Sequence, residues 1–156
     1  MPAPARLIRQ FQSEDAGSCC DLVCACLRID PLVPPAAVER LVRAESPAAM
    51  RERAKLFYLA VCVVEGCIAG VAGVDMNEIR LLYVGPEFRS RGVGGALLVH
   101  AESMVPPALF RDVFVYSAAA AVDFYRAHGY NPGGAHLFDV GGAAMPTIFM
   151  TKRLAE

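Results

Sequence analysis

The sequence lacks the charge imbalance and the long apolar runs that would place it on a nucleic acid or in a membrane. Its 156 residues carry 15 lysines and arginines against 16 aspartates and glutamates, a formal net charge of −1. A membrane-spanning helix needs roughly 18 consecutive apolar residues, and the longest apolar stretches, such as residues 56–64, are far shorter. The N-terminus also lacks the charged and apolar regions of a signal peptide. We therefore expect a cytoplasmic protein with no nucleic-acid or membrane partner.

The cysteines lack the spacing of a zinc site. Four of them crowd into one short segment and two follow far along the chain: Cys19, Cys20, Cys24, Cys26, Cys62 and Cys67. Structural zinc is usually held by two separated pairs of ligands. In a helix Cys20 and Cys24 would share a face, as small apolar side chains do. We interpret all the cysteines as reduced and expect no metal, with metal or redox chemistry as the less favoured alternative.

Apolar residues make up 55% of the chain, which is enough for one sizeable core in a domain of ordinary length. Hydrophobic periodicity predicts strands at 6–12, 56–64, 67–75, 78–84, 113–116, 135–140 and 147–152. It predicts helices at 13–28, 36–43, 46–55, 93–105 and 119–128. This order indicates one domain over residues 1–156 with an α+β (mixed α/β) fold, in which helices flank a largely antiparallel sheet.

The segment that follows the strand 78–84 carries the most information. After a proline turn, three glycines in four positions, Gly92, Gly94 and Gly95, open an amphipathic helix. The first backbone N–H groups of a helix lack partners and carry the positive end of its dipole. Glycine lets a ligand approach that backbone closely, and Arg89 and Arg91 add charged donors. The pattern therefore predicts an anion site suited to a diphosphate.

Two common phosphate loops fit this segment poorly. No Lys-Ser or Lys-Thr follows the glycines, as the loop of nucleoside triphosphatases requires. The dinucleotide-binding pattern needs a third glycine where Leu97 stands. A glycine-rich turn that binds nothing is the remaining alternative, and the flanking arginines, the strand before it and the helix after it argue against that reading.

Several segments resemble the GNAT superfamily of acetyltransferases. Residues 89–94, Arg-Ser-Arg-Gly-Val-Gly, match its pyrophosphate-binding signature, Arg/Gln-x-x-Gly-x-Gly/Ala. Residues 82–88, Leu-Tyr-Val-Gly-Pro-Glu-Phe, resemble the strand that leads into that signature. Residues 124–130, Phe-Tyr-Arg-Ala-His-Gly-Tyr, resemble the family's Phe-Tyr-x-x-x-Gly-Phe element, and residues 148–154 resemble its closing strand. The resemblance covers residues 56–154 well and the N-terminal third only in the order of its elements.

The resemblance implies a GNAT-like fold with a splayed sheet of about seven strands, which parts between the fourth strand, 78–84, and the fifth, 113–116. In this family acetyl-coenzyme A (acetyl-CoA) is a co-substrate that lies in the opening, its pantetheine arm along the fourth strand and its diphosphate at the next helix. Many members place an asparagine or serine against the pantetheine, and Ser117 stands one residue before that position. The implied cofactor-binding residues are Leu82, Tyr83, Val84, Arg89, Ser90, Arg91, Gly92, Val93, Gly94, Gly95 and Ser117.

Acyl transfer to an amine needs a neutral amine, a polarised thioester carbonyl and a proton for the leaving thiolate. A backbone N–H near Leu82 is the candidate oxyanion donor. Tyr125 is the candidate general acid, because a phenol stays protonated at neutral pH. Glu78 is the candidate general base, directly or through water, since it stands at the offset before Arg89 that the family's histone acetyltransferases use. The histidines at 100 and 128 are interpreted as surface residues.

We therefore expect an N-acetyltransferase that moves an acetyl group from acetyl-CoA to a primary amine of a small molecule or peptide by direct attack. Two alternatives remain open. The first is a non-catalytic acyl-CoA-binding sensor or regulatory domain, and the second is an interaction protein whose glycine loop binds nothing. The sequence names neither the acceptor nor the oligomeric state, and a homodimer is one candidate.

Overall fold

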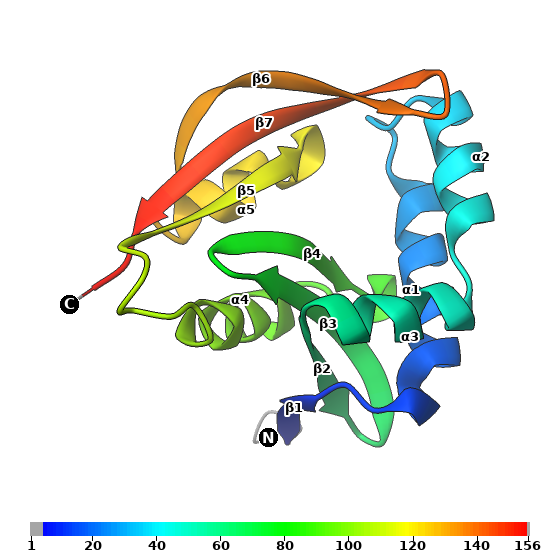
Figure 1. The fold of residues 1–156 in the computed structure, drawn as a ribbon. Coiled ribbons are helices and arrows are strands. Elements are labelled where there is room, and N and C mark those ends of the chain that lie inside the picture. Colours follow the sequence, from blue (N-terminus) through cyan, green and yellow to red (C-terminus); the bar gives the residue numbers. More distant parts are fainter. Residues whose placement is uncertain (1–4, 156) are drawn as a thin grey trace.

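Seven strands of the chain form one mixed sheet. The computed structural model describes residues 5–155, and its strands lie in the order β1-β2-β3-β4-β5-β7-β6 (Figure 1). Their bounds are β1 (Arg6–Gln10), β2 (Tyr58–Val64), β3 (Cys67–Asp75), β4 (Glu78–Val84), β5 (Asp112–Ala118), β6 (Asn131–Val140) and β7 (Ala143–Arg153). Neighbouring strands are antiparallel except β4 and β5, which are parallel. The mostly antiparallel sheet of seven strands flanked by helices is confirmed.

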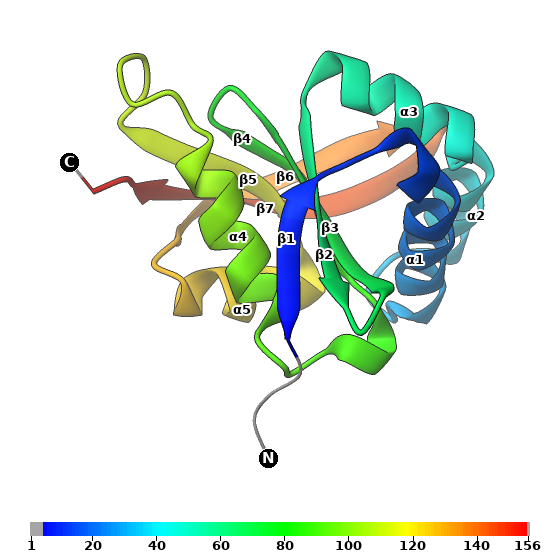
Figure 2. The same cartoon turned by 90° about the horizontal axis from the view of Figure 1, so that it is seen from below.

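Helices cover both faces of this sheet. Three of them, α1 (Ala16–Ile29), α2 (Pro35–Ala44) and α3 (Pro47–Leu56), lie on one side, and α4 (Val93–Ser103) and α5 (Val122–Ala127) lie on the other (Figure 2). Short 3₁₀ turns precede three of the helices: η1 (Ser13–Asp15), η2 (Pro86–Phe88) and η3 (Ala119–Ala121). No helix among residues 5–155 is long and apolar enough to cross a membrane.

Each face of the sheet buries its own apolar cluster. On one face Leu97 and Leu98 of α4 pack with strand residues such as Val113. On the other face Cys19 and Val23 of α1 pack with residues of β2 and β3. The helical spacing of the buried residues in α1 and α4 makes both helices amphipathic. The cysteines crowded into α1 are buried and free, in the role of small apolar residues.

A bulge interrupts β4 near its start. Ile79 pairs with Val74 of β3, whereas Leu81 pairs with Gly73, so Arg80 is an extra residue without a partner across the ladder. An inserted residue reverses the faces to which the side chains before and after it point. Ile79 therefore joins the cluster under α4, as do the even-numbered residues beyond the bulge.

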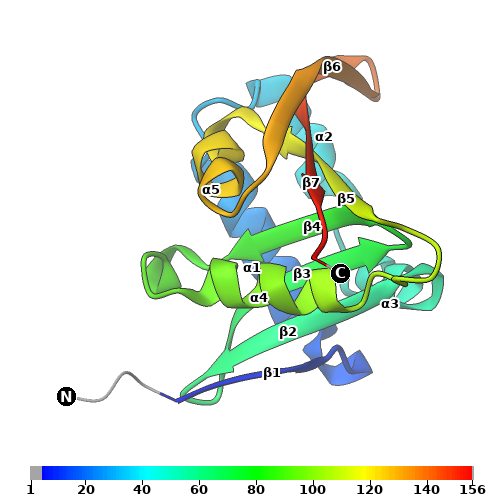
Figure 3. The same ribbon diagram turned by 90° about the vertical axis from the view of Figure 1, so that its left-hand side faces the viewer.

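The strands β4 and β5 part almost as soon as they begin. Two residue pairs join them in the described chain, Glu78 with Phe114 and Ile79 with Val115. Beyond these pairs, β5, β6 and β7 turn away from the direction of β2, β3 and β4 (Figure 3). The second half of β4 is thus left without a strand on one side.

Several element bounds differ from the predicted ones. Residue 56 ends α3 instead of opening β2, and the helix expected at 119–128 is divided into η3 and α5. Both C-terminal strands begin earlier than expected. The start of β6 could not be predicted from composition, because Pro132 and Gly134 are residues typical of strand ends. In the structure they lie at a bulge, and the pairing with β7 continues through it.

We predict opposite effects on stability from alanine at two glycines. A Cβ atom at Gly70 of β3 would lie 2.7 Å from Cδ1 of Leu97 and 3.0 Å from the Tyr83 carbonyl oxygen, so α4 can approach the sheet only over a glycine. Gly70→Ala should lower the free energy of unfolding by about 1–3 kcal/mol, the usual cost of overpacking. Gly17 of α1 has nothing within 4 Å of its Cβ position.

Gly17→Ala is therefore the control, and it should raise the free energy of unfolding by about 0.5–1 kcal/mol through helix propensity. Urea unfolding of both variants measures the two changes. Equal stability of the Gly70→Ala variant and the parent would show that α4 does not pack as closely on β3 as described.

Candidate functional site

The free edge of β4 presents backbone groups to the opening between the two halves of the sheet. The N–H group of Gly85 donates to the Ala69 carbonyl at 2.8 Å, so in the antiparallel register Gly85 and Tyr83 bond toward β3. Along an antiparallel strand, the backbone groups of successive residues point to opposite sides. The N–H and carbonyl groups of Leu82 and Val84 therefore point away from β3, into the side of β4 that β5 has left.

One of these groups is already satisfied within the protein. The carbonyl oxygen of Val84 accepts hydrogen bonds from the Cys26 thiol, at 3.2 Å, and from Nε of Arg89, at 3.3 Å. Burial raises the pKa of the Cys26 thiol, which keeps its proton available for this bond. Among residues 5–155, nothing pairs with the N–H and carbonyl groups of Leu82 or with the N–H of Val84. These are the positions where an extended ligand can bond to β4 like an added strand.

The glycine segment forms the entry to α4. Gly92 is the N-cap and takes the left-handed conformation, with a φ of 80°, which a side chain would oppose. Ser90 also has a positive φ, 62°, so the backbone turns sharply before the helix. The first intrahelical bond is donated by Ala96 to the Gly92 carbonyl. The N–H groups of Val93, Gly94 and Gly95 therefore lack helical partners and can hold an anion.

A cavity of about 600 Å³ joins these features and passes through the sheet. It begins at the glycine segment before α4 and at α5 on one face, runs between the free edge of β4 and the end of β5, and reaches the α1–α2 loop on the other face. The lining residues used below are Cys26, Ile29, Asp30, Val33, Leu82, Tyr83, Val84, Arg89, Ser90, Gly92, Val93, Gly94, Gly95, Ala118, Phe124, Tyr125, His128 and Met145. Most of its wall is apolar.

Two phenols face this cavity from opposite sides of the sheet. Tyr125 belongs to the cluster under α4 and is 5% exposed, and Tyr83 packs with the cluster under α1. Neither hydroxyl has a hydrogen-bond partner among residues 5–155, although both residues line the cavity. Burial raises the pKa of Tyr125 well above its usual value and that of Tyr83 to about 12. Both phenols are therefore protonated near neutral pH and free to donate to a ligand.

Most of the predicted cofactor-binding residues line the cavity, and two do not. Leu82, Tyr83, Val84, Arg89, Ser90, Gly92, Val93, Gly94 and Gly95 all lie along its wall. The guanidinium of Arg91 instead lies 5.8 Å from the ring centre of Phe88. Ser117 is buried, and its hydroxyl donates to the Ala118 carbonyl at 2.8 Å. Its neighbour Ala118 reaches the cavity in its place.

The two predicted catalytic residues have different positions. Tyr125 lines the cavity, whereas Glu78 does not. The Glu78 carboxylate is 3.4 Å from the Arg80 guanidinium, on the same side of the sheet as α3, where Arg80 also lies 5.6 Å from the ring centre of Phe57. Glu78 thus lies near the point where β4 and β5 still pair, outside the cavity.

Sequence reasoning missed residues that only the fold brings together. His128, interpreted as a surface residue, lines the cavity at the end where the glycine segment lies, and its Nδ1 lies 2.8 Å from the Phe124 carbonyl oxygen. Because a carbonyl only accepts, Nδ1 carries the proton in that bond. Asp30 and Met145 line the other end from distant parts of the chain. Of these residues, only His128 had a local signal in the sequence, because it lies within the motif at residues 124–130. Residues 5–155 contain no cluster of three metal-ligating side chains.

The arrangement is that of an enzyme site for a long ligand with an anionic end. The sequence also matches the family model described as an acetyltransferase (GNAT) domain, over residues 30–148. That match spans most of the chain, so the protein belongs to the GNAT acetyltransferase family and is an acetyltransferase. The sequence matches no curated protein.

Solved structures share this fold over nearly their whole length. A GCN5-related N-acetyltransferase from Rhodopseudomonas palustris superposes with a TM-score of 0.87 at 22% identity, over 99% of this chain and 98% of that one. PaiA N-acetyltransferase from Thermoplasma acidophilum, in complex with coenzyme A, gives 0.73 at 16% identity, over 96% and 99%. The structure of yncA from Salmonella typhimurium with its cofactor acetyl-CoA gives 0.71 at 15% identity, over 97% and 95%.

Proposed function

We propose that this protein transfers an acetyl group from acetyl-CoA to a primary amine by direct attack of the amine nitrogen. The observation that supports this proposal is the continuous cavity that passes through the sheet beside the free edge of β4. A cofactor can enter it from the α4 face and an acceptor from the α1–α2 face. The two reactants then meet beside Leu82 and Tyr125 without exchanging places.

The residues along the cavity fit the parts of acetyl-CoA in order. The unpaired N–H groups at the start of α4 and the Arg89 guanidinium suit the diphosphate. The free N–H and carbonyl groups of β4 suit the amides of the pantetheine arm, which would bond to the strand as a neighbouring strand does. The Val84 carbonyl is already occupied by Cys26 and Arg89. Leu82 and the N–H of Val84 therefore supply the bonds to the arm.

The chemistry then assigns roles to the groups nearest the middle of the cavity. The amine nitrogen forms a bond to the thioester carbon, and the Leu82 N–H donates to the oxygen that becomes negative. The carbon–sulfur bond breaks as this intermediate collapses. Tyr125 gives its proton to the departing sulfur, and the proton lost by the amine leaves through a base. Free coenzyme A and the acetylated amine are the products.

Glu78 is the proposed base, and its place outside the cavity means that it acts through water. Its carboxylate lies on the α3 side of the sheet beside Arg80, on the face from which the acceptor enters. A water chain from the amine to Glu78 would carry the proton out toward this face. Direct contact between Glu78 and the amine is not required by the proposal.

We predict that Gly94→Val weakens acetyl-CoA binding at least about tenfold, a loss of about 1.4 kcal/mol. A Cβ atom at Gly94 already lies 3.2 Å from the Phe124 ring and 3.4 Å from Val84 Cγ2, so a valine would fill the diphosphate end of the cavity. Gly17→Val is the matched control, because Gly17 is the second residue of α1 as Gly94 is of α4. Calorimetry that shows equal affinity in the two variants would refute the assignment of the diphosphate site.

We predict that Tyr125→Phe lowers kcat by about 10²–10⁴-fold, the usual range for a positioned acid, with little change in acetyl-CoA affinity. Tyr130→Phe is the control, since the Tyr130 ring lies 5.3 Å from that of Tyr125 and its buried hydroxyl also lacks a partner in the described chain, but it does not line the cavity. Steady-state kinetics compares the two. A large loss in Tyr83→Phe and none in Tyr125→Phe would give the acid role to Tyr83 instead.

We predict that Glu78→Gln lowers kcat most at low pH, where the protonated amine predominates and its deprotonation limits the rate. The affinity for acetyl-CoA should be unchanged. Glu87→Gln, in the exposed turn η2, controls for the loss of one negative charge. The measurement is the pH–rate profile, and a profile equal to that of the parent would show that Glu78 has no part in proton removal.

A further inference from the structure

The two ends of the cavity carry opposite charge. Arg89 is the one arginine or lysine among its described lining residues, and it lies at the diphosphate end with His128. Asp30 is the one carboxylate among them, and it lies at the far end, where α1 passes into the α1–α2 loop. An acceptor amine arrives in solution mainly as a cation. The end of the cavity that the cofactor leaves free therefore has the charge that attracts it.

The Asp30 carboxylate is held in a fixed position. Its Oδ1 accepts a hydrogen bond from the Leu32 N–H at 2.9 Å, which closes a short turn after α1. Oδ2 has no partner in the described part of the chain and can accept from a ligand. Arg80, on the same side of the sheet, is already engaged by Glu78 and by the ring of Phe57. Asp30 thus stands ready for a cation, while no free cation among the described lining residues stands at this end for an acceptor's carboxylate.

The walls around Asp30 are apolar and continue into an aromatic surface. Ile29, Val33 and Met145 line this end of the cavity. Met145 pairs with Phe138 of β6, so their side chains lie on one face of the sheet. Side chains on that face form the aromatic surface, which consists of Tyr116, His136, Phe138 and Phe149.

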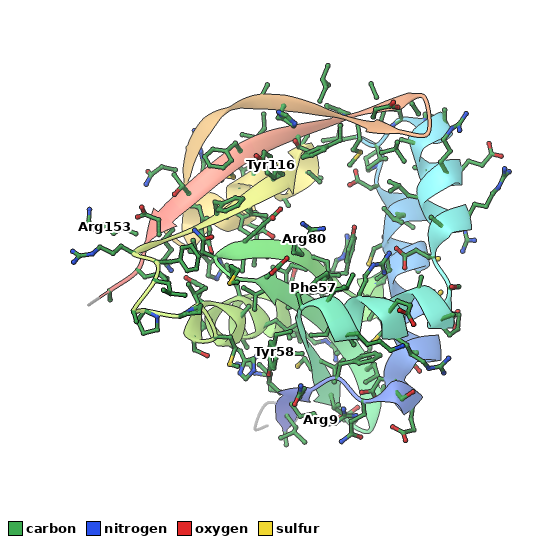
Figure 4. The ribbon with its side chains drawn as sticks, viewed as in Figure 1. Arg9, Phe57, Tyr58, Arg80, Tyr116 and Arg153 are labelled. Atoms are coloured by element: carbon green, nitrogen blue, oxygen red, sulfur yellow. The ribbon has the colours of Figure 1, made fainter. Side chains whose placement is uncertain are left out.

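The rings of the aromatic surface contact one another and remain open to solvent on one side. Ring centres of Phe138 lie 5.0 Å from Tyr116 and 4.5 Å from His136, and Phe138 is 38% exposed. Figure 4 shows Tyr116 on β5 and Arg80 on β4, on the two strands that part at this place. Aromatic side chains in edge-to-face and tilted contact, only partly buried, offer a flat apolar body a place to pack.

We propose that the acceptor is an arylalkylamine without a carboxylate, whose ammonium group is received by Asp30 and whose ring packs on the aromatic surface. This inference rests on the proposed function and narrows its acceptor. A charged carboxylate or phosphate on the acceptor would face Asp30 with no free cation beside it, which disfavours amino acids and phosphorylated amines. An amine without a ring would leave the aromatic surface uncovered and lose its contribution.

The first test compares three amines on the intact enzyme with saturating acetyl-CoA: 2-phenylethylamine, phenylalanine and propylamine. The kcat/KM for 2-phenylethylamine should exceed each of the others by about tenfold or more, the usual discrimination from a missing apolar group or an unpaired charge. Equal or better use of phenylalanine or propylamine overturns this inference and leaves the transfer to amines standing. Acetyl-CoA binding with no turnover on any amine would instead contradict the proposed function and support a sensor.

The second test uses paired variants. Asp30→Asn keeps an oxygen for the Leu32 N–H and removes the charge, so KM for 2-phenylethylamine should rise about tenfold or more while acetyl-CoA affinity is unchanged. Asp21→Asn, exposed on α1, is its control. Phe138→Ala should raise KM for 2-phenylethylamine and leave that for propylamine unaltered. Its control is Leu137→Ala, the 66% exposed neighbour on the opposite face of β6. Unchanged KM in Asp30→Asn or Phe138→Ala overturns that residue's role and with it the inference.

Discussion

The parting of β4 from β5 is the constraint on which the rest of the structure depends. A strand inside a sheet satisfies its backbone groups on both sides, and leaving buried groups unpaired costs about 1–3 kcal/mol for each. Within the described residues β4 meets β5 at two residue pairs, so beyond the bulge the N–H and carbonyl groups that point away from β3 have no strand partner. That cost is retained because the same groups form the wall of the cavity. The bulge at Arg80 produces the departure and also turns the groups of Leu82 toward the opening.

The protein offsets part of this cost in a way that ties the site to the fold. Cys26 of α1 and Arg89 of the glycine loop both donate to the Val84 carbonyl, which links three elements at the edge of the opening. Arg6 of β1 in turn donates to the Arg91 carbonyl at 2.9 Å and lies against Gly92. The loop that we propose as the diphosphate site is thus held from both sides before any ligand binds. Preorganisation of this kind reduces the ordering that binding would otherwise require.

Local sequence predicted those parts of the fold and site that local chemistry determines. The bounds of β3 and β4 were predicted to the residue, because the turns before them contain residues with positive φ, Glu65, Gly66 and Met76. The glycine loop was found because a left-handed N-cap at Gly92 needs glycine. These signals lie within a few neighbouring residues, so no knowledge of the tertiary structure was needed to interpret them.

The remaining features depend on register and on contacts between distant segments. Glu78 was chosen by its offset before Arg89, which does not say to which face of the strand its side chain points. The extra residue Arg80 puts Glu78 and Leu82 on opposite faces, and only the strand register reveals that relation. The position of Ser117 depends on register in the same way. Its side chain lies on the buried face of β5, whereas the next residue, Ala118, lies on the face that lines the cavity. Asp30 and Met145 stand more than a hundred residues apart in the chain, and only the approach of α2 to the β6–β7 hairpin brings them to one cavity.

The surroundings of Cys26 argue for direct transfer over a covalent relay through the protein. It is the one cysteine among the described residues that line the cavity, so it is the candidate for an acyl-thioester intermediate. A nucleophilic cysteine needs a lowered pKa and a free thiolate. Here burial raises the pKa of the Cys26 thiol, against the partial opposing effect of Arg89, and its proton is bonded to the Val84 carbonyl. Losing that proton would leave a thiolate facing a carbonyl oxygen. With the thiol committed to structure, the cavity that opens on both faces favours the proposed direct attack of an amine on the thioester.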